Sequence, residues 1–301
     1  MNELLQQVIN GVSLGSIYAL IALGYTMIYG ILRFINFAHG DVFMVGAFVG
    51  FYTAPIFTKI FGGSTFVNGL MVMAAAMIIC AVLGVTIEKF AYKPLRNRPK
   101  LTVLITAIGM SLFLEFGGQL VFGPDPKLFP ALMPSTAIVN TETLVISTNS
   151  LIVIVTAFIL MILLRTIVYK TKIGTAMRAV SYNHYAASLM GININTVISF
   201  VFAIGSSLAG AAAVLYSSVY PSINPLMGIF PGLKAFIAAV LGGIGNLYGA
   251  AIGGLIIGLV ETLVTGYISS TYRDAISFSI LILILLVKPS GIMGKYETEK
   301  V

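Results

Sequence analysis

Long apolar runs restrict the fold of this chain more than any other feature. A helix needs about 20 apolar residues to cross a hydrocarbon layer about 30 Å thick. Hydrophobic residues make up 58% of the chain and charged residues only 9%, which excludes an ordinary water-exposed surface. The runs are continuous rather than alternating, so a β-barrel is excluded and the expected fold is an all-α integral membrane protein with about 8 to 9 transmembrane helices. The expected spans lie near 6–30, 41–60, 66–88, 101–122, 148–168, 195–217, 232–247, 249–268 and 274–288.

The first run and the single cysteine give two further expectations. The run starts at MNELLQQV without a basic region or a small-residue cleavage site, so it is interpreted as a span and not as a removed signal peptide. Cys80 lies inside the third run and is the only cysteine, which excludes a disulfide within the chain. We interpret it as a small apolar filler.

The distribution of basic residues predicts the orientation in the membrane. Thirteen of the 17 Lys and Arg residues fall on one side of the predicted spans, and such residues collect on the cytoplasmic side. The N-terminus is therefore expected outside and the C-terminus in the cytoplasm. The run EKFAYKPLRNRPK at 88–100 is interpreted as a determinant of this topology in preference to a lipid-binding segment. The thirteen are Arg33, Lys89, Lys93, Arg96, Arg98, Lys100, Arg165, Lys170, Lys172, Arg178, Lys288, Lys295 and Lys300; the other side keeps Lys59, Lys127, Lys234 and Arg273.

Two stretches are too polar to span the membrane. Residues 123–147 carry four prolines and are expected outside, where a partner can dock. Residues 169–194 are expected inside, and their apolar residues Met177, Val180, Ala187 and Met190 recur at helical spacing. We therefore expect a single amphipathic helix at about 176–190 on the cytoplasmic face; resting on lipid is the alternative role for it.

Glycines are spaced for close helix packing. Small residues four positions apart let membrane helices approach each other, and this spacing occurs in the pairs 11/15, 46/50, 245/249, 249/253 and 254/258. The glycine-rich break at 241–254 and the segment INFAHGD at 35–41 are expected on the same side of the membrane. Spans one to three are accordingly expected to match spans seven to nine as a parallel internal repeat.

Enzyme and nucleotide chemistry have no basis in the sequence. The chain has no phosphate-binding loop, no HExxH motif, no GxSxG elbow and no paired cysteines, and it holds only two histidines. No metal ligand set and no catalytic residue is predicted, and nucleic acid is not an expected partner. The glycine-rich run also departs from a dinucleotide fingerprint, because Tyr248 stands where the last glycine belongs.

Ionisable residues inside spans are costly and are therefore candidates for function. Glu115 lies in the middle of a span, Glu261 lies deep in another, and Asp41 begins the second. For Glu115, a helix-to-helix hydrogen bond and a role in transport stay open alternatives; for Glu261 we favour the structural role. Neither a relay of acids nor a series of arginines is present, so energy for transport must come from outside the chain, or the solute flows downhill.

Four motifs in order resemble one transporter family. INFAHGDVFMVGAF at 35–48, GTAMRAVSYNHYAASLMGIN at 174–193, FAIGSSLAGAAAVLY at 202–216 and VLGGIGNLYGAAIGGLIIG at 240–258 resemble the permeases of branched-chain amino-acid ABC importers, specifically the H-type subunit. The likeness covers nearly the whole chain. It implies a single permease domain that works with a second, M-type permease, two ATPase subunits that bind ATP, and a solute-binding protein outside. The chain itself is expected to bind no cofactor.

The resemblance also implies roles for individual residues. The segment 174–193 is similar to the loop that couples such permeases to their ATPases, with Tyr185 standing where the strict family pattern has a glutamate. Small alanines would permit insertion into an ATPase cleft, and a glycine would end the helix. The coupling candidates are Arg178, Tyr182, Asn183, His184, Ala186, Ala187, Leu189 and Gly191.

Two interpretations of INFAHGD stay open together. One is a tight turn, with Asp41 capping the next helix through its first free amides. The other is a polar helix break that lines the inner end of the transport pathway, where irregular backbone is tolerated beside protein or water. The path candidates are Asn36, His39, Gly40, Asp41, Glu115 and Asn246.

The expected function is transport of leucine, isoleucine and valine across the inner, plasma membrane as a non-catalytic subunit. Import of urea or a short amide is the alternative within the same family. An ATP-independent channel or facilitator is the alternative of another class.

Overall fold

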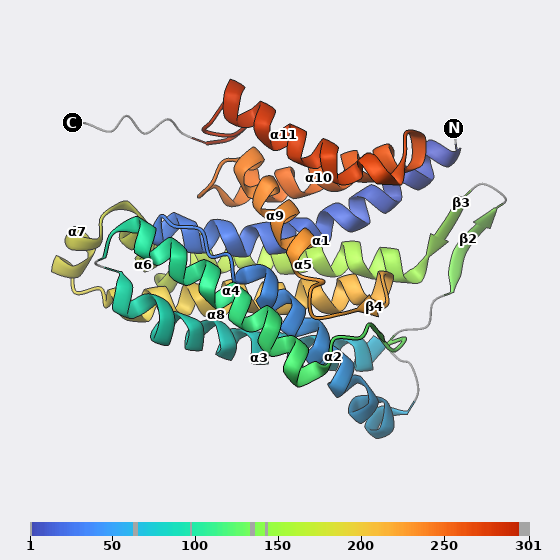
Figure 1. Ribbon diagram of the computed structural model, residues 1–301, viewed down its shortest axis with the longest axis horizontal. Coiled ribbons are helices and arrows are strands. Elements are labelled where there is room, and N and C mark those ends of the chain that lie inside the picture. Colours follow the sequence, from blue (N-terminus) through green and yellow to red (C-terminus); the bar gives the residue numbers. More distant parts are fainter. Residues whose placement is uncertain (1, 63–65, 97, 133–135, 142–143, 295–301) are drawn as a thin grey trace.

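The computed structural model describes residues 2–62, 66–96, 98–132, 136–141 and 144–294. Within them the chain is a bundle of helices with a few short strands (Figure 1). Lys295 and Lys300, two of the basic residues counted above, lie outside the described residues. The α-helices are α1 (Asn2–Leu32), α2 (His39–Phe61), α3 (Phe66–Ile87), α4 (Lys100–Phe122), α5 (Thr148–Lys170), α6 (Lys172–Tyr182), α7 (His184–Leu189), α8 (Ile194–Val219), α9 (Ile229–Gly242), α10 (Leu247–Tyr267) and α11 (Arg273–Val287).

Shorter elements connect these helices. A π-helical turn η1 (Glu88–Tyr92) and a 3-10 turn η2 (Lys93–Leu95) follow α3, and a 3-10 turn η3 (Ser270–Tyr272) precedes α11. Strands β2 (Ala137–Thr141) and β3 (Leu144–Ser147) form an antiparallel hairpin. β1 (Lys127–Leu128) pairs antiparallel with β4 (Ser222–Ile223), and the Phe129 amide donates a further hydrogen bond of 2.7 Å to Pro221. This pairing ties the segment after α4 to the segment after α8.

Eight helices of the described chain are long and apolar enough to cross a membrane, which confirms the all-α membrane fold. The span expected at 232–247 is instead the 14-residue helix α9. At 1.5 Å per residue α9 is about 21 Å long, too short to cross a layer of about 30 Å alone. The first and seventh elements of the expected repeat therefore differ in length, since α1 has 31 residues.

The two ends of the bundle carry different elements. Figure 1 shows α6 and α7 at one end of the long axis, which we call the α7 end. The β2–β3 hairpin and the start of α1 lie at the other end, which we call the hairpin end. The segment that follows α11 lies at the α7 end, because Ile292 and Met293 donate backbone hydrogen bonds to Leu241 and Gly242 at the end of α9. The start of α1 and the segment 288–294 thus lie at opposite ends.

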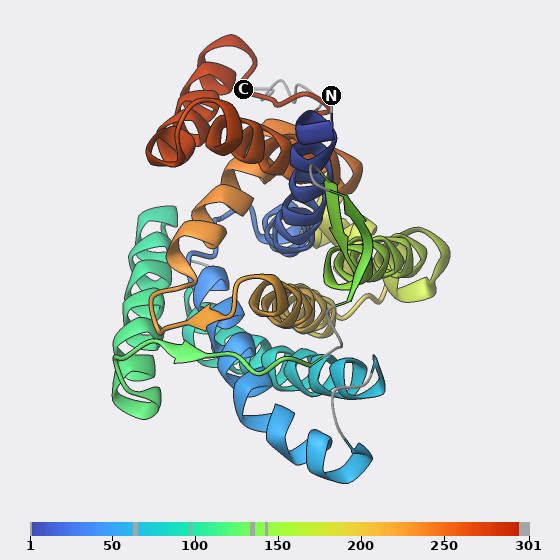
Figure 2. The same cartoon turned by 90° about the vertical axis from the view of Figure 1, so that its right-hand side faces the viewer.

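Helices α1 and α8 form the centre of the bundle. Helix α1 packs against α5, α8, α9 and α10, whereas α4 and α11 lie on the outside (Figure 2). The crossing of α1 and α10 depends on paired small residues: a Cβ added at Gly258 would lie 2.3 Å from the Cα of Gly15, and one added at Gly254 would lie 2.5 Å from the Cα of Ala19. The glycine spacing in the sequence predicted this close approach.

The segment between α1 and α2 turns back into the bundle. α1 ends at Leu32, and Arg33 has a left-handed backbone with a φ of 54°. The chain then returns until the His39 ring meets the α1 backbone at Gly24, where an added Cβ would lie 2.4 Å from the His39 Nε2. Gly24 is eight residues before Leu32, so α2 begins about 12 Å inside the end of α1. INFAHGD thus runs from the end of α1 to the middle of the bundle, and the prediction that it lines the inner end of the transport pathway stays a prediction.

Candidate functional site

A cavity of about 230 Å³ lies beside the start of α2, halfway along the bundle. Ser111, which lines it, is the middle residue of α4. The wall combines side chains from α1, α2, α4 and α9, and it is apolar except for a few groups. The lining residues are Tyr25, Phe37, Gly40, Asp41, Ile108, Ser111, Leu112, Glu115, Gly228, Ile229, Gly232 and Leu233.

Asp41 is the most enclosed polar group of this wall. Its residue is 2% exposed, and the Ser111 hydroxyl donates a 2.5 Å hydrogen bond to its Oδ2. Asp41 stands in the first turn of α2, where a negative charge is favourable to the helix dipole. The expected cap is absent, because α2 begins at His39 with Ala38 as the capping position and no side-chain cap bond. The carboxylate points instead across the cavity to α4.

Glu115 adds a second carboxyl group to the same wall. It stands four residues after Ser111, so both face the same side of α4. Among the described residues its carboxyl group has no hydrogen bond or ion pair, so the helix-to-helix hydrogen bond is not observed there, and the role in transport stays a prediction. A carboxyl group left without a protein partner in an otherwise apolar wall is available to a cation.

The start of α9 completes the wall. Gly228 and Ile229 open this short helix at the cavity, and its N-terminal amides carry partial positive charge. The backbone there passes very close to α2: a Cβ added at Gly228 would lie 2.1 Å from the Gly40 oxygen, and one added at Gly232 would lie 3.0 Å from the Gly40 Cα. Any side chain at Gly40 or Gly228 would push α9 away from α2.

Asn36 and His39 support the break without lining the cavity. The Tyr92 hydroxyl donates a 2.6 Å hydrogen bond to Asn36 Oδ1, and Asn36 is 3% exposed. The His39 ring is fully buried and packs edge-on against Tyr25, with ring centroids 4.6 Å apart. The two residues fix the path by which the chain returns to the middle of the bundle.

Asn246 lies away from the cavity, at the α7 end. Its Oδ1 accepts hydrogen bonds from the Tyr248 and Gly249 amides at 3.0 and 3.1 Å and so caps α10. Its Nδ2 donates a 2.9 Å bond to the Met293 carbonyl. The structure therefore brings Gly40, Asp41 and Glu115 together and separates Asn246 from them. Gly245 in the break at 243–246 lies beside Gly30, close to where α1 ends, whereas the break at 33–38 continues from that end into the middle of the bundle.

The sequence did not point to Ser111, Tyr25, Gly228 and Gly232 as wall residues. Ser111 had a usable signal, because it lies one helical turn before Glu115 on the same face of an apolar helix. The contribution of α9 had no such signal, since its apolar run resembles the start of an ordinary span.

The segment 174–193 forms two helices rather than the one expected at 176–190. The backbone of Asn183 is extended, with φ −156° and ψ 112°, and its side chain caps α7 by accepting a 3.0 Å hydrogen bond from the Ala186 amide. Such a residue starts a new helix instead of continuing the old one. The second helix ends at Leu189, and Gly191 just beyond it has a left-handed φ of 79°. Ile192 and Gly191 donate backbone hydrogen bonds to the carbonyls of Ala187 and Ser188.

The break divides the expected coupling residues into two groups. Ala187 is 3% exposed and packs inward, and His184 contacts the Ile31 carbonyl at the end of α1 with its Nε2 at 3.0 Å. Arg178 lies 5.5 Å from the Tyr169 ring centroid. The residues that protrude from the α7 end are Tyr182, Tyr185, Leu189 and Met190, which are 91%, 74%, 70% and 82% exposed. Of the four apolar residues at helical spacing, Met177, Val180 and Ala187 are buried and Met190 is exposed.

A buried ion cluster lies toward the hairpin end. Lys234 Nζ is 2.7 Å from Glu261 Oε1 and 2.7 Å from Asp274 Oδ1, and the Tyr18 hydroxyl donates a 2.9 Å hydrogen bond to Glu261 Oε2. Lys234 is 2% exposed, so its expected place among the loop cations of one side was wrong. The cluster joins α1, α9, α10 and α11, and the paired Glu261 fits the structural role favoured for it.

Comparison with known proteins places the chain in a transporter family. Residues 7–285 match the family described as branched-chain amino acid transport system / permease component. The chain is 44% identical over 300 residues to LivH of Salmonella typhimurium, a high-affinity branched-chain amino acid transport system permease protein, with 99% of this chain and 97% of the relative covered. It is 41% identical over 300 residues to BraD of Pseudomonas aeruginosa, covering 99% and 98%. A probable branched-chain amino acid permease, LivH of Methanocaldococcus jannaschii, is 30% identical over 299 residues, covering 93% and 89%.

Proposed function

Because the chain belongs to the permease family of branched-chain amino acid transport systems, we propose that it carries leucine, isoleucine and valine across the inner membrane as one subunit of an ATP-driven importer. The mid-bundle cavity carries this proposal. It pairs carboxyl groups with a helix N-terminus in an otherwise apolar wall, which suits a small zwitterion with an apolar side chain.

The groups of the cavity match the groups of such a solute. The substrate ammonium faces Asp41 and Glu115, and its carboxylate faces the N-terminal amides of α9, in the manner of broken helices in other transporters. The branched side chain lies against Ile108, Leu112 and Leu233. With few polar contacts the site passes the solute without holding it tightly, and selection belongs to a separate binding protein.

Energy for import comes from partner subunits that bind ATP. The exposed apolar residues Tyr182, Tyr185, Leu189 and Met190 form a protruding surface at the α7 end, which we propose docks into an ATPase. His184 and the Ile31 carbonyl link α7 to the end of α1, so motion of the docked ATPase reaches the central helix. The α7 end is then cytoplasmic and the hairpin end faces outward.

The remaining partners follow from the importer assembly. A second, M-type permease completes the pathway, and a solute-binding protein delivers substrate at the hairpin end, where β2 and β3 stand on the surface. We assign no catalytic group and no cofactor to this chain.

Uptake into proteoliposomes tests the proposal. Labelled leucine and, in parallel, urea are offered to the chain alone and to the chain with its partner permease, ATPases and binding protein. Leucine accumulation that requires the full set and ATP supports the proposal. Accumulation of urea but not leucine selects the alternative solute, and equilibration of a solute by the chain alone identifies a channel.

Paired variants test the cavity and the docking surface separately. Asp41→Asn keeps the shape and the Ser111 contact but removes the charge, and we expect leucine uptake to fall at least tenfold while the ATPase activity of the assembly remains. Leu189→Asp is expected to uncouple uptake from ATP, because an acidic group at an exposed apolar contact is desolvated on docking. Thr175→Asp, on the exposed side of α6, is the control for Leu189. Normal uptake by Asp41→Asn contradicts the cavity assignment, and equal effects at Leu189 and Thr175 contradict the docking surface.

A further inference from the structure

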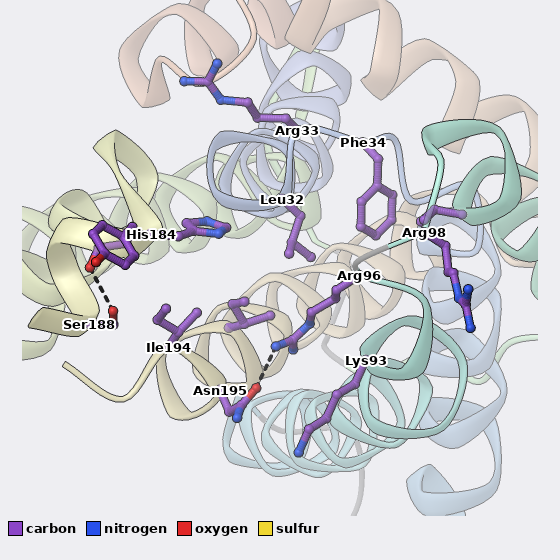
Figure 3. A pocket seen from close by; sticks show the side chains of 13 residues that line it. Leu32, Arg33, Phe34, Lys93, Arg96, Arg98, His184, Ser188, Ile194 and Asn195 are labelled. Carbon is purple, nitrogen blue, oxygen red and sulfur yellow. Dashed lines mark hydrogen bonds between the residues drawn. The ribbon is translucent and has the colours of Figure 1, made fainter. Parts of the chain in front are cut away.

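A cavity at the α7 end is basic. Its volume is about 620 Å³, and it opens between the end of α1, the turns η1 and η2, and the start of α8 (Figure 3). The lining contains four permanent cations: Arg33, Lys93, Arg96 and Arg98. Among the described lining residues there is no Asp or Glu.

Arg96 is balanced by a carboxylate in the described structure. It pairs with Glu88, whose other oxygen accepts a 2.6 Å hydrogen bond from Ser199, and it donates a 2.8 Å bond to Asn195 across the cavity (Figure 3). Burial lowers the pKa of this guanidinium while Glu88 raises it, and the group stays protonated. Arg96 and Glu88 are thus structural and join the segment 88–96 to α8.

Lys93 and Arg98 have no acidic partner among the described residues, and both are exposed. Figure 3 shows them on the side of the cavity opposite His184 and Ser188 of α7. Two free cations beside a hollow that also offers a hydroxyl and an imidazole are the groups that bind phosphate oxygens.

The position of this cavity favours the headgroup of a phospholipid over a free phosphate ion. It lies beyond the end of α3, and the surface of α3 and η1 that leads to it is apolar and outward-facing, with Val82 62% and Phe90 79% exposed. A molecule held there has acyl chains on α3 and its headgroup at Lys93 and Arg98. Basic pockets between membrane helices on the cytoplasmic side bind anionic headgroups in this way.

We propose that this cavity binds the phosphodiester headgroup of an anionic phospholipid from the inner leaflet. The proposal takes the α7 end as cytoplasmic, and it assigns Lys93 and Arg98 a role beyond setting topology. Because the wall includes His184 and Ser188 of α7 and shares Tyr185 with the docking surface, the lipid also braces α7 against η2.

Lipid retention measured by native mass spectrometry tests the proposal on the full chain, alone and in the assembled importer. The probes are phosphatidylglycerol, phosphatidylcholine and, as a free anion, inorganic phosphate. We compare the wild type with Lys93→Gln/Arg98→Gln and with the control Lys89→Gln/Lys172→Gln, which removes two exposed cations outside the cavity lining. At about fivefold per cation, the cavity variant is expected to lose about 25-fold in affinity for phosphatidylglycerol, and the control much less.

Each outcome of this measurement decides the proposal. Selective retention of phosphatidylglycerol by the wild type and the control, but not by the cavity variant, supports it. Equal loss in both variants shows a diffuse basic surface and overturns it. If inorganic phosphate binds and displaces the lipid, the ligand is a free anion and the proposal is overturned. If the isolated chain retains the lipid but the assembled importer does not, an ATPase side chain fills the cavity, and the proposal is again overturned. None of these readouts depends on transport.

Discussion

The ion cluster of Lys234, Glu261 and Asp274 gives a prediction whose size follows from the structure. Lys234→Met removes the cation that lies 2.7 Å from both carboxylates and leaves Glu261 buried, with its side chain 4% exposed. Breaking a buried pair from one side costs about 3 to 5 kcal/mol. Tyr18 still donates to Glu261, and Arg273 lies 3.8 Å away, so we expect the lower end of this range.

The cost is measurable as a melting temperature. At about 2 °C per kcal/mol for a chain of this size, a loss of about 3 kcal/mol lowers Tm by about 6 °C. Cys80 is the only cysteine and is fully buried, so a thiol-reactive fluorogenic dye reports unfolding of the detergent-solubilised protein. Lys59→Met, which removes an exposed lysine near the end of α2, is the matched control and is expected to change stability by less than about 0.5 kcal/mol.

The double variant Lys234→Met/Glu261→Gln separates a lost contact from an unpaired charge. If the cost comes from the uncompensated carboxylate, replacing Glu261 by neutral Gln recovers at least half of the lost Tm, because Asp274 keeps Arg273 beside it at 3.6 Å. A double variant that melts as low as Lys234→Met refutes this reasoning and assigns the cost to packing.

Three further predictions concern close contacts and the cavity. Gly258→Leu places a side chain against the backbone of Gly15 and is expected to prevent stable folding, measured as the yield of monodisperse protein. Gly109→Leu, at an open position, is the control. Equal yields of the two variants would contradict the close packing of α1 and α10. Gly191→Ala puts a Cβ at a φ of 79°, costs about 1 kcal/mol and should weaken coupled ATP hydrolysis; unchanged hydrolysis counts against this end of α7 as part of the docking surface. Ser111→Ala removes the hydrogen bond to Asp41 and should alter leucine uptake more than Ser279→Ala on α11; no difference argues against Ser111 as a wall residue.

The sequence predicted the spans better than their depth. The length and hydropathy of the apolar segments located α4 and α5 within a few residues, because both properties can be read from one continuous segment. The run at 232–247 has the same local character, but α9 starts inside the bundle, where Gly228 meets Gly40. That contact joins residues far apart in the chain, and hydropathy does not encode it.

The candidate site was only partly predicted, because it too depends on contacts between residues far apart in the chain. Asp41 and Glu115 stood out because charge inside a span is costly. The two residues line one cavity because the chain turns back into the bundle after Arg33. A left-handed backbone is usually predicted from a glycine, and Arg33 adopts it without being one. Similarly, the spacing of apolar residues predicted one amphipathic helix at 176–190. In the structure Asn183 ends the first helix, α6, and its side chain caps a second helix, α7. Asparagine within a helical pattern is a signal for such a cap.

The pairing of β1 with β4 has a mechanical consequence. β1 continues from α4, which carries Ser111 and Glu115, and β4 leads through the short stretch 224–227 to Gly228 at the start of α9. Both strands lie at the hairpin end, yet the helices attached to them form two walls of the mid-bundle cavity. A displacement of either strand is therefore transmitted to both α4 and α9. The small sheet couples the surface at the hairpin end to the two cavity walls in the interior.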